Sequence, residues 1–182
     1  ILTEIRFVPD DLRPSTFGVW EATQMFAAHF PEEALAEWLN RKGNPNMGQL
    51  VLRSGGASKV EWYVSWQRDA KQPRFHTLVA WIDADYVRLE SGRQRRLLDV
   101  ADALCSATNS VFARIHTVVP ENTNAYSMVN LKVRLPEPCW VQYFGTPYLD
   151  LFGRDRLLST PGVEVQPIGE RHIRMTIGES PF

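Results

Sequence analysis

The chain has 182 residues, of which 44% are apolar, and its 20 basic and 21 acidic side chains leave a formal charge of −1 at pH 7. This length and composition fit a single domain that buries a sizeable core. Because the charge is close to zero, no overall field draws the protein onto nucleic acid or an anionic membrane, and we expect neither as a partner. No run approaches the roughly 18 apolar residues of a membrane-spanning helix, and Ile1–Arg6 has no signal-peptide pattern, so we expect a cytoplasmic protein.

The first fifty residues predict a strand followed by helical structure. Alternation over Ile1–Val8 predicts a strand that ends at Pro9. Apolar side chains at a spacing of three to four residues predict a helix over Thr16–Phe30. A second helical stretch is predicted to begin at Pro31, with acidic residues in its first turn, and to end near Gly43.

The middle of the chain predicts three strands, over Gln49–Arg53, Val60–Gln67 and Phe75–Leu89. The links between them are short and polar, which favours antiparallel neighbours. In the second strand apolar and polar residues alternate, so we expect one buried face and one face toward solvent. The third is largely apolar on both faces and is therefore predicted to be a central strand.

Beyond the middle, Ser91 is predicted to cap a helix that runs to about Thr108, with Cys105 on its apolar side. Strands are predicted over Val111–Val119 and Met128–Leu135. Runs of strands interrupted by helices, rather than alternating with them, indicate the α+β class. We therefore expect a single domain over residues 1–182, with a mainly antiparallel central sheet flanked by helices.

Four short segments near the C-terminus contain or end in turn residues and predict a strand, a short helix and paired strands. They are Trp140–Gly145, Tyr148–Gly153, Pro161–Val165 and Ile177–Pro181. In this order they resemble the ending of bacterial type VI immunity proteins. The whole chain looks most like the immunity protein 52 family of polymorphic-toxin systems.

That resemblance implies a protein that binds rather than catalyses. A member of this family would bind and neutralise a cognate secreted toxin encoded beside it, and would need no cofactor. The family is associated with toxins of restriction-endonuclease-like fold, which implies that the partner is a nuclease. A nuclease presents a positively charged cleft to DNA or RNA, and an inhibitor can cover such a cleft with carboxylates.

The strand Val60–Gln67 offers residues suited to such an interface. Glu61 and Tyr63 fall on the face opposite its apolar side chains, and an exposed aromatic ring beside acids is typical of interface anchors. We predict a toxin-binding surface that includes Glu61, Tyr63, Asp83 and Asp85. Further acids and one further aromatic anchor are predicted near strand ends and loops: Asp10, Asp11, Glu90, Glu121 and Trp20.

Asp83 and Asp85 also support an alternative. Two carboxylates at positions i and i+2 of a strand share a face, as in sites that hold Mg²⁺ or Mn²⁺ for phosphoryl or glycosyl transfer. Neither a glycine-rich phosphate loop nor a Walker-type lysine accompanies them, which favours a solvated strand end or a contact surface. The alternative is a small-molecule-binding domain or a metal-dependent enzyme that uses Asp83 and Asp85.

The remaining candidates for chemistry have ordinary structural interpretations. The histidines lie one per element, without the i, i+4 pair of a zinc site: His29, His76, His116 and His172. Because Cys105 falls on an apolar helix face, its pairing with His116 as nucleophile and base is disfavoured. We predict no catalytic residue and no metal site, and we expect Cys105 and Cys139 to be reduced thiols.

Three arginines open the helix predicted after Ser91: Arg93, Arg95 and Arg96. Positive charge in a first helical turn opposes the helix dipole, which hints at a site for phosphate or for an acidic partner. The commoner interpretation is a solvated helix face.

Overall fold

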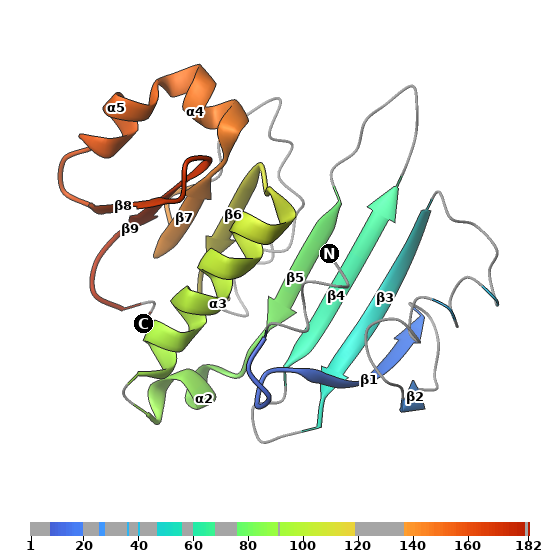
Figure 1. Cartoon of the computed structure of the whole chain (residues 1–182). Helices are drawn as coiled ribbons and strands as arrows, with labels where there is room; N and C mark the ends of the chain where they lie inside the picture. The colour runs from blue at the N-terminus through green and yellow to red at the C-terminus, as the bar shows by residue number, and fades with distance from the viewer. Residues whose placement is uncertain are drawn as a thin grey trace. The chain divides into compact units, whose positions relative to one another are not determined.

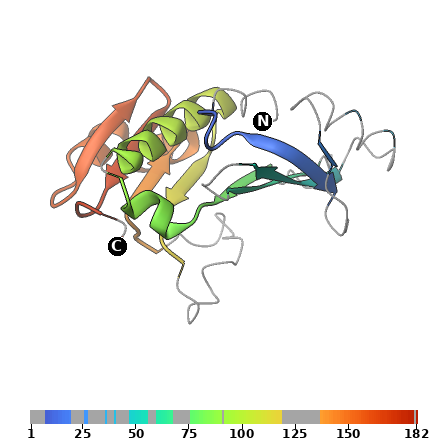
Figure 2. The same cartoon turned by 90° about the horizontal axis from the view of Figure 1, so that it is seen from below.

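The computed structural model describes residues 8–19, 26–27, 47–55, 60–67, 76–90, 92–118, 137–180 and 182, together with Ala36 and Asn40. The chain divides into two compact units, residues 1–104 and 105–182. Each unit contains its own antiparallel sheet, one of five strands and one of four (Figure 1; Figure 2). The α+β class with antiparallel pairing is thus confirmed, with its strands divided between two sheets. The expectation of one domain over the whole chain stays a prediction.

The first unit contains a sheet with strand order β2-β1-β3-β4-β5, followed by two helices (Figure 1). The elements are β1 Pro14–Val19, β2 Phe26–Ala27, β3 Met47–Ser54, β4 Glu61–Gln67, β5 Thr77–Trp81, α2 Ala84–Arg88 and α3 Arg93–Thr108. Residues 93–104 of α3 belong to this unit. Strands β3 and β4 and the helix from position 93 to Thr108 confirm the corresponding sequence predictions to within a few residues.

One face of the five-stranded sheet carries the core of the first unit. Trp62 at its centre is only 2% exposed, and its indole Nε1 donates a hydrogen bond to the carbonyl oxygen of Leu12 at 3.0 Å. Val100 and Leu104 of α3 pack against this cluster. The other buried members are Val8, Leu12, Phe17, Leu52, Val60 and Val64. The predicted alternation in β4 is confirmed, because its apolar residues are the ones that face this core.

The helix predicted over Thr16–Phe30 is wrong at both ends of that range. Residues 14–19 form β1, which pairs with β3 in the register Phe17↔Leu52, and residues 26–27 form β2. Phe17 reaches the core from a strand, and the pairing of β1 with β3 satisfies backbone groups that a helix would have paired locally. The apolar spacing that indicated a helix is therefore overridden by long-range strand pairing.

The predicted strand Phe75–Leu89 is also corrected. Its described part is extended as β5 over Thr77–Trp81, and α2 then begins at Ala84, directly after its N-cap Asp83. In the described part of the sheet β5 is the last strand, beside β4, and not a central one. Its apolar residues on the second face are only partly buried, and Val79 is 36% exposed.

The second unit contains a sheet with strand order β6-β7-β9-β8 and two short helices (Figure 1). The elements are β6 Phe112–Ile115, β7 Val141–Phe144, α4 Thr146–Phe152, α5 Arg154–Leu158, β8 Glu164–Ile168 and β9 His172–Thr176. The predicted order of strand, short helix and paired strands is confirmed. The predicted segment Ile177–Pro181 is not one of the paired strands, however, because these are β8 and β9, and residues 177–180 follow β9 outside any strand. Strand β6 is shorter than the predicted Val111–Val119.

Side chains of α4, α5 and the two strands β7 and β9 form the core of the second unit. Its buried members are Phe144, Tyr148, Leu149, Leu157, Ile173 and Met175. Tyr148 contacts Phe144 edge-on, with ring centroids 5.8 Å apart, and stacks on Phe152 at 6.0 Å. These contacts explain why the segment needs aromatic residues at those positions.

The other face of this sheet is buried as well, and it contains polar groups. Arg174 is 2% exposed, its Nη2 donates to Oε1 of Gln166, and in register it pairs with the fully buried Tyr143. The ring Nε2 of His172 lies 2.9 Å from the carbonyl oxygen of Ser110. Burying a guanidinium group is costly unless it is hydrogen-bonded, and Gln166 supplies one acceptor for Arg174.

Several sequence predictions fall partly or wholly outside the described residues. These are the strand Ile1–Val8 except Val8, the helix from Pro31 to Gly43 except the helical Ala36 and Asn40, the cap Ser91, the strand Met128–Leu135, and the candidate contacts Trp20 and Glu121. Cys105 is buried, as predicted, and Cys139 is partly buried; their reduced state stays a prediction.

Candidate functional site

The second face of the five-stranded sheet brings two of the predicted binding residues together. Antiparallel register places Arg53, Glu61 and Trp81 in one row across β3, β4 and β5. The adjacent row consists of Val51, Tyr63 and Val79. Residues paired in register project from the same side of a sheet, so these six residues form one surface, which we call the Tyr63 face.

Glu61 connects the two rows of the Tyr63 face. The Tyr63 hydroxyl donates a hydrogen bond to Glu61 Oε2 at 2.6 Å, while Arg53 Nε lies 2.8 Å from the other carboxylate oxygen, Oε1. Both oxygens of the carboxylate therefore have a donor within the chain. Burial, together with the hydrogen bond to Glu61 and its negative charge, raises the pKa of Tyr63 to about 12, so the phenol is neutral at physiological pH.

The Tyr63 face is partly open to solvent. Val51, Tyr63 and Trp81 are intermediate in exposure, and Val79 is exposed. The Arg53 side chain is 50% exposed and that of Glu61 is 34% exposed. Half-buried aromatic and aliphatic groups beside an internally paired ion pair are typical of protein-binding surfaces.

Asp83 and Asp85 lie beyond the end of β5, next to the Glu61 row, because Trp81 pairs with Glu61. The prediction that they share a strand face is wrong, since Asp83 is the N-cap of α2 and Asp85 is in its first turn. Asp83 Oδ1 accepts the backbone N–H of Asp85 at 2.9 Å, and Asp85 Oδ1 lies 3.8 Å from Arg88 Nη1. Both acids are exposed, so they remain accessible to a partner.

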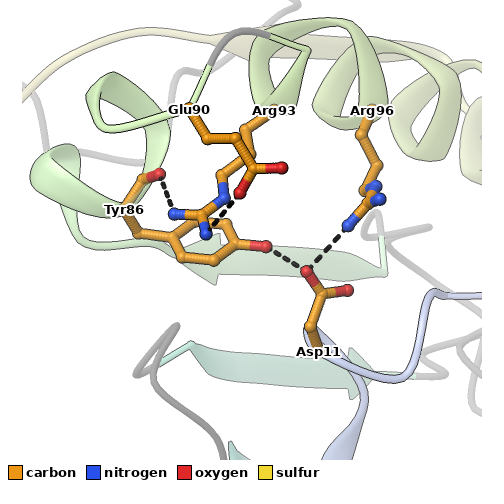
Figure 3. Close-up of polar contacts among 5 residues, drawn as sticks. All are labelled: Asp11, Tyr86, Glu90, Arg93 and Arg96. Carbon is orange, nitrogen blue, oxygen red and sulfur yellow. Dashed lines mark hydrogen bonds and ion pairs between the residues drawn. The ribbon is translucent and has the colours of Figure 1, made fainter.

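Figure 3 shows that two other candidate acids are already used within the first unit. Asp11 Oδ2 accepts hydrogen bonds from the Tyr86 hydroxyl and from Arg96 Nη1, the latter at 3.0 Å. Glu90 lies 2.7 Å from Arg93 Nη2, and Arg93 also donates to the carbonyl oxygen of Tyr86 at 2.8 Å (Figure 3). These contacts connect the turn around Asp11 with α2 and α3.

Each arginine of the cluster at the start of α3 forms an ion pair with an acid of the first unit. Arg93 contacts Glu90 and lies over the Tyr86 ring, 4.1 Å from its centroid. Arg96 contacts Asp11, and Arg95 Nε lies 3.0 Å from Asp99 Oδ1 one turn along the helix. The three charges are thus paired with acids of the same unit, which favours the interpretation as a structural helix face.

The electrostatics of the Asp11 contacts have a consequence for stability. Burial acts to raise the pKa of Asp11, but the Tyr86 hydrogen bond and the charge of Arg96 outweigh it, so the pKa lies below the usual 3.8. Burial and the hydrogen bond to Asp11 raise the pKa of Tyr86. A carboxyl group with a lowered folded-state pKa stabilises the fold above its unfolded pKa, and this stabilisation is lost as the pH falls through the folded value.

We expect Asp11→Asn to lower the free energy of unfolding at pH 7 by about 1 kcal/mol or less, because the Asp11 and Arg96 side chains are 39% and 50% exposed. The difference from the unmodified protein should shrink below about pH 4, where Asp11 becomes protonated in the unmodified chain too. Urea unfolding at a series of pH values measures this. Asp10→Asn is the matched control, because Asp10 is 90% exposed and contacts only Arg13 among the ion pairs described; an equal effect of both changes would contradict the prediction.

Sequence reasoning placed Glu61 and Tyr63 on one face but missed the rest of the surface. Arg53, Val79 and Trp81 are distant in sequence, and only the register of β3, β4 and β5 brings them beside Tyr63. Alternation within each strand was the available signal, and it does not specify which residues face each other across strands.

Within the described ranges, no three His, Cys, Asp or Glu side chains are grouped so as to hold a metal ion. No helix in the same part of the chain has the length and apolar character that crossing a membrane requires. Comparison with family models, curated proteins and solved structures finds no match to this chain.

Proposed function

We propose that this chain is an immunity protein that binds and neutralises a cognate secreted bacterial toxin, a nuclease of restriction-endonuclease-like fold encoded beside it. On this proposal it acts in the cytoplasm by recognition and needs no catalytic residue or cofactor. The observation that carries the proposal is the Tyr63 face, where Glu61 holds Tyr63 in place within a partly exposed surface that also contains Val79 and Trp81. The resemblance of the C-terminal segments to immunity proteins supplies the class of partner.

The geometry of this face suits tight binding. A tyrosine contributes a large contact area with few rotatable bonds, and the hydrogen bond to Glu61 orders it before a partner arrives. Because Glu61 is paired with Arg53, that carboxylate adds little net charge to the surface. Negative charge that would draw in the basic cleft of a nuclease is therefore supplied mainly by Asp83, with a smaller contribution from Asp85, which lies 3.8 Å from Arg88.

The experiment is calorimetry with the toxin encoded by the neighbouring gene, together with survival of cells that express the toxin. Tyr63→Ala should weaken binding at least tenfold, which corresponds to about 1.4 kcal/mol, and should reduce protection. Leu151→Ala is the control, because Leu151 is a 70% exposed apolar residue of the second unit and its loss should leave affinity unchanged.

Charge reversal tests the acids separately. Asp83→Lys combined with Asp85→Lys should slow association and weaken binding by several kcal/mol if both carboxylates are desolvated in the complex, and by about 1 kcal/mol or less if they lie on its rim. Unchanged affinity and protection after all three substitutions would show that the Tyr63 face is not the interface. Failure of the unmodified protein to bind the neighbouring toxin would contradict the proposed function itself.

A further inference from the structure

The outer edge of β5 differs from the other ends of the two sheets. Natural sheets protect an edge strand with proline, charged residues, a bulge or a very short strand, because its outward backbone groups can pair with another chain. In the described part of the chain, β2 has only two residues, β6 contains Arg114, and β8 contains Glu164 and Pro167. Strand β5 has none of these features: Thr77–Trp81 is uncharged and pairs with β4 without a register shift (Figure 1).

The centre of this edge is open to solvent. Val79 is 36% exposed, and Ala80 is exposed as well. Apart from the pairing with β4, no hydrogen bond joins Leu78, Val79 or Ala80 to another described residue. Backbone groups of alternate residues in an edge strand point away from the neighbouring strand, so at least one of these three residues presents its N–H and C=O outward. A further strand can therefore pair with β5.

The sequence of β5 is complementary to itself in the antiparallel direction. Two copies related by a two-fold axis at Val79 place Thr77 of each copy opposite Trp81 of the other. The same axis places Leu78 opposite Ala80, and the two valines face each other. A large side chain thus lies opposite a small one on both sides of the axis. Pairs of β-branched residues, and pairs of a β-branched with an aromatic residue, stabilise neighbouring strands.

The charges that flank β5 in the sequence favour the same direction. Arg74, which lies outside the described residues, precedes the strand, and Asp83 and Asp85 follow it. Because antiparallel copies run in opposite directions, the end where one chain enters β5 is the end where the other chain leaves it. The sequence that contains Arg74 in one copy therefore leads in beside the acids of the other copy. This charge complementarity identifies a second copy as the partner that suits this edge.

We propose that the outer edge of β5 binds the same edge of a second copy of this chain, antiparallel and with the two-fold axis at Val79. In one alternation the two Val79 residues exchange both backbone hydrogen bonds, and in the other Leu78 and Ala80 exchange them across the axis. Either way, the two five-stranded sheets become one continuous sheet. Residues that are opposite each other project to the same side, so the Tyr63 faces of the two copies join at Val79. The inference concerns the chain alone and does not depend on the proposed toxin.

Self-association of the full chain over a concentration series tests this pairing. An edge of five residues is small beside the roughly 1,200 Å² of a stable interface, so we expect a weak dimer with a Kd on the order of 0.1 mM. Sedimentation equilibrium between about 10 µM and about 1 mM should show the average mass rising from one chain toward two. The amide NMR signals of Leu78, Val79 and Ala80 should shift over the same range. A chain that stays monomeric throughout, or that associates without a response from β5, would overturn the inference.

Charges introduced at the axis test the register. Val79→Lys and Val79→Glu each place like charges opposite each other, so each variant alone should associate at least about tenfold more weakly than the unmodified chain. An equimolar mixture of the two variants should regain association, because opposite charges then face each other at the axis. Circular dichroism verifies that each variant is folded before mixing. Recovery in the mixture separates loss of pairing from loss of structure, and folded variants that do not recover would refute the register about Val79.

Leu151→Lys is the matched control for the charge variants. It makes the same kind of change, from an apolar side chain to lysine, at a 70% exposed residue of the second unit. Its self-association should equal that of the unmodified chain. A loss as large as that of Val79→Lys would show that overall charge, and not the β5 edge, controls association.

An extended strand of the toxin is the alternative occupant of this edge. If the β5 amide signals respond to the toxin but not to the concentration of the chain alone, the edge belongs to the toxin and the second-copy inference fails. If the toxin does not bind at all while the chain still pairs through β5, the proposed function fails and the inference stands.

Discussion

Replacement of Trp62 by alanine is expected to lower the free energy of unfolding by about 3–5 kcal/mol. Trp62 is 2% exposed at the centre of the core of the first unit, and its indole donates to the Leu12 carbonyl oxygen at 3.0 Å. Alanine removes the largest side chain of that cluster and leaves a cavity. It also leaves the Leu12 carbonyl without this donor, which adds to the cost of the cavity.

Two further variants divide this effect into its parts. Trp62→Phe retains most of the ring volume but not the N–H donor, so it should cost less than alanine, about 1–3 kcal/mol. Leu89→Ala is the control, because Leu89 is 81% exposed and its change should stay within about 0.5 kcal/mol. Chemical denaturation measures all three, and a Trp62→Ala variant as stable as Leu89→Ala would show that the face of β4 assigned to the core is not buried.

The alternation in β4 made this assignment predictable from sequence, since Val60, Trp62 and Val64 share one face in any straight strand. Helix α3 was predictable for a similar reason, because apolar residues spaced three to four apart over 16 residues fit a helix and do not fit a strand. In the C-terminal segments, glycines and short apolar runs indicated the element order correctly. These are all regions where local pattern and tertiary environment agree.

The regions that differ from the sequence predictions are those where the local sequence pattern and the tertiary environment favour different structures. Residues around Phe17 have a helical spacing of apolar side chains, yet pairing with β3 determines their conformation. The run after Thr77 is apolar enough for one long strand, but the chain turns into α2 at Asp83, whose side chain caps the helix by accepting the Asp85 N–H. The available signal was Asp83 itself, because aspartate is a preferred N-cap residue at the start of a helix. The same Asp-x-Asp sequence also fits a metal site, so the signal was ambiguous.

Only the part of the candidate surface that lies within one strand was predictable from the sequence. That Glu61 and Tyr63 share a face follows from their spacing, whereas the contribution of Arg53 depends on register. Register is determined by the whole sheet, and a shift of one residue in one direction would place the core residue Leu52 opposite Glu61. The pairing of Asp11 with Arg96, which are distant in sequence, likewise depends on the tertiary structure.

Gly145→Ala is expected to destabilise the second unit by about 3 kcal/mol or more, at or above the upper end of the usual cost of overpacking. Gly145 follows β7 and is the N-cap of α4, with an ordinary φ of −88°, and its N–H donates to the Val111 carbonyl oxygen at 2.9 Å. A Cβ atom at this position would lie 2.1 Å from the Ser110 carbonyl oxygen and 3.0 Å from that of Val111. Both neighbours are backbone, so the chain before β6 would have to move away from the end of β7.

Gly162→Ala is the matched control, because there an added Cβ atom costs backbone strain and not a steric clash. Gly162 has a φ of +77°, and a Cβ atom added there would meet no described atom within 4 Å, so alanine introduces conformational strain without a clash. That strain should cost about 1–2 kcal/mol, partly offset by the reduced freedom of the unfolded chain. Denaturation of both variants gives their stability, and amide hydrogen exchange in β7 and β9 reports on the second unit specifically. Gly145→Ala should be clearly the less stable of the two. The reverse order would show that the close approach of the Ser110 backbone to Gly145 does not hold in solution.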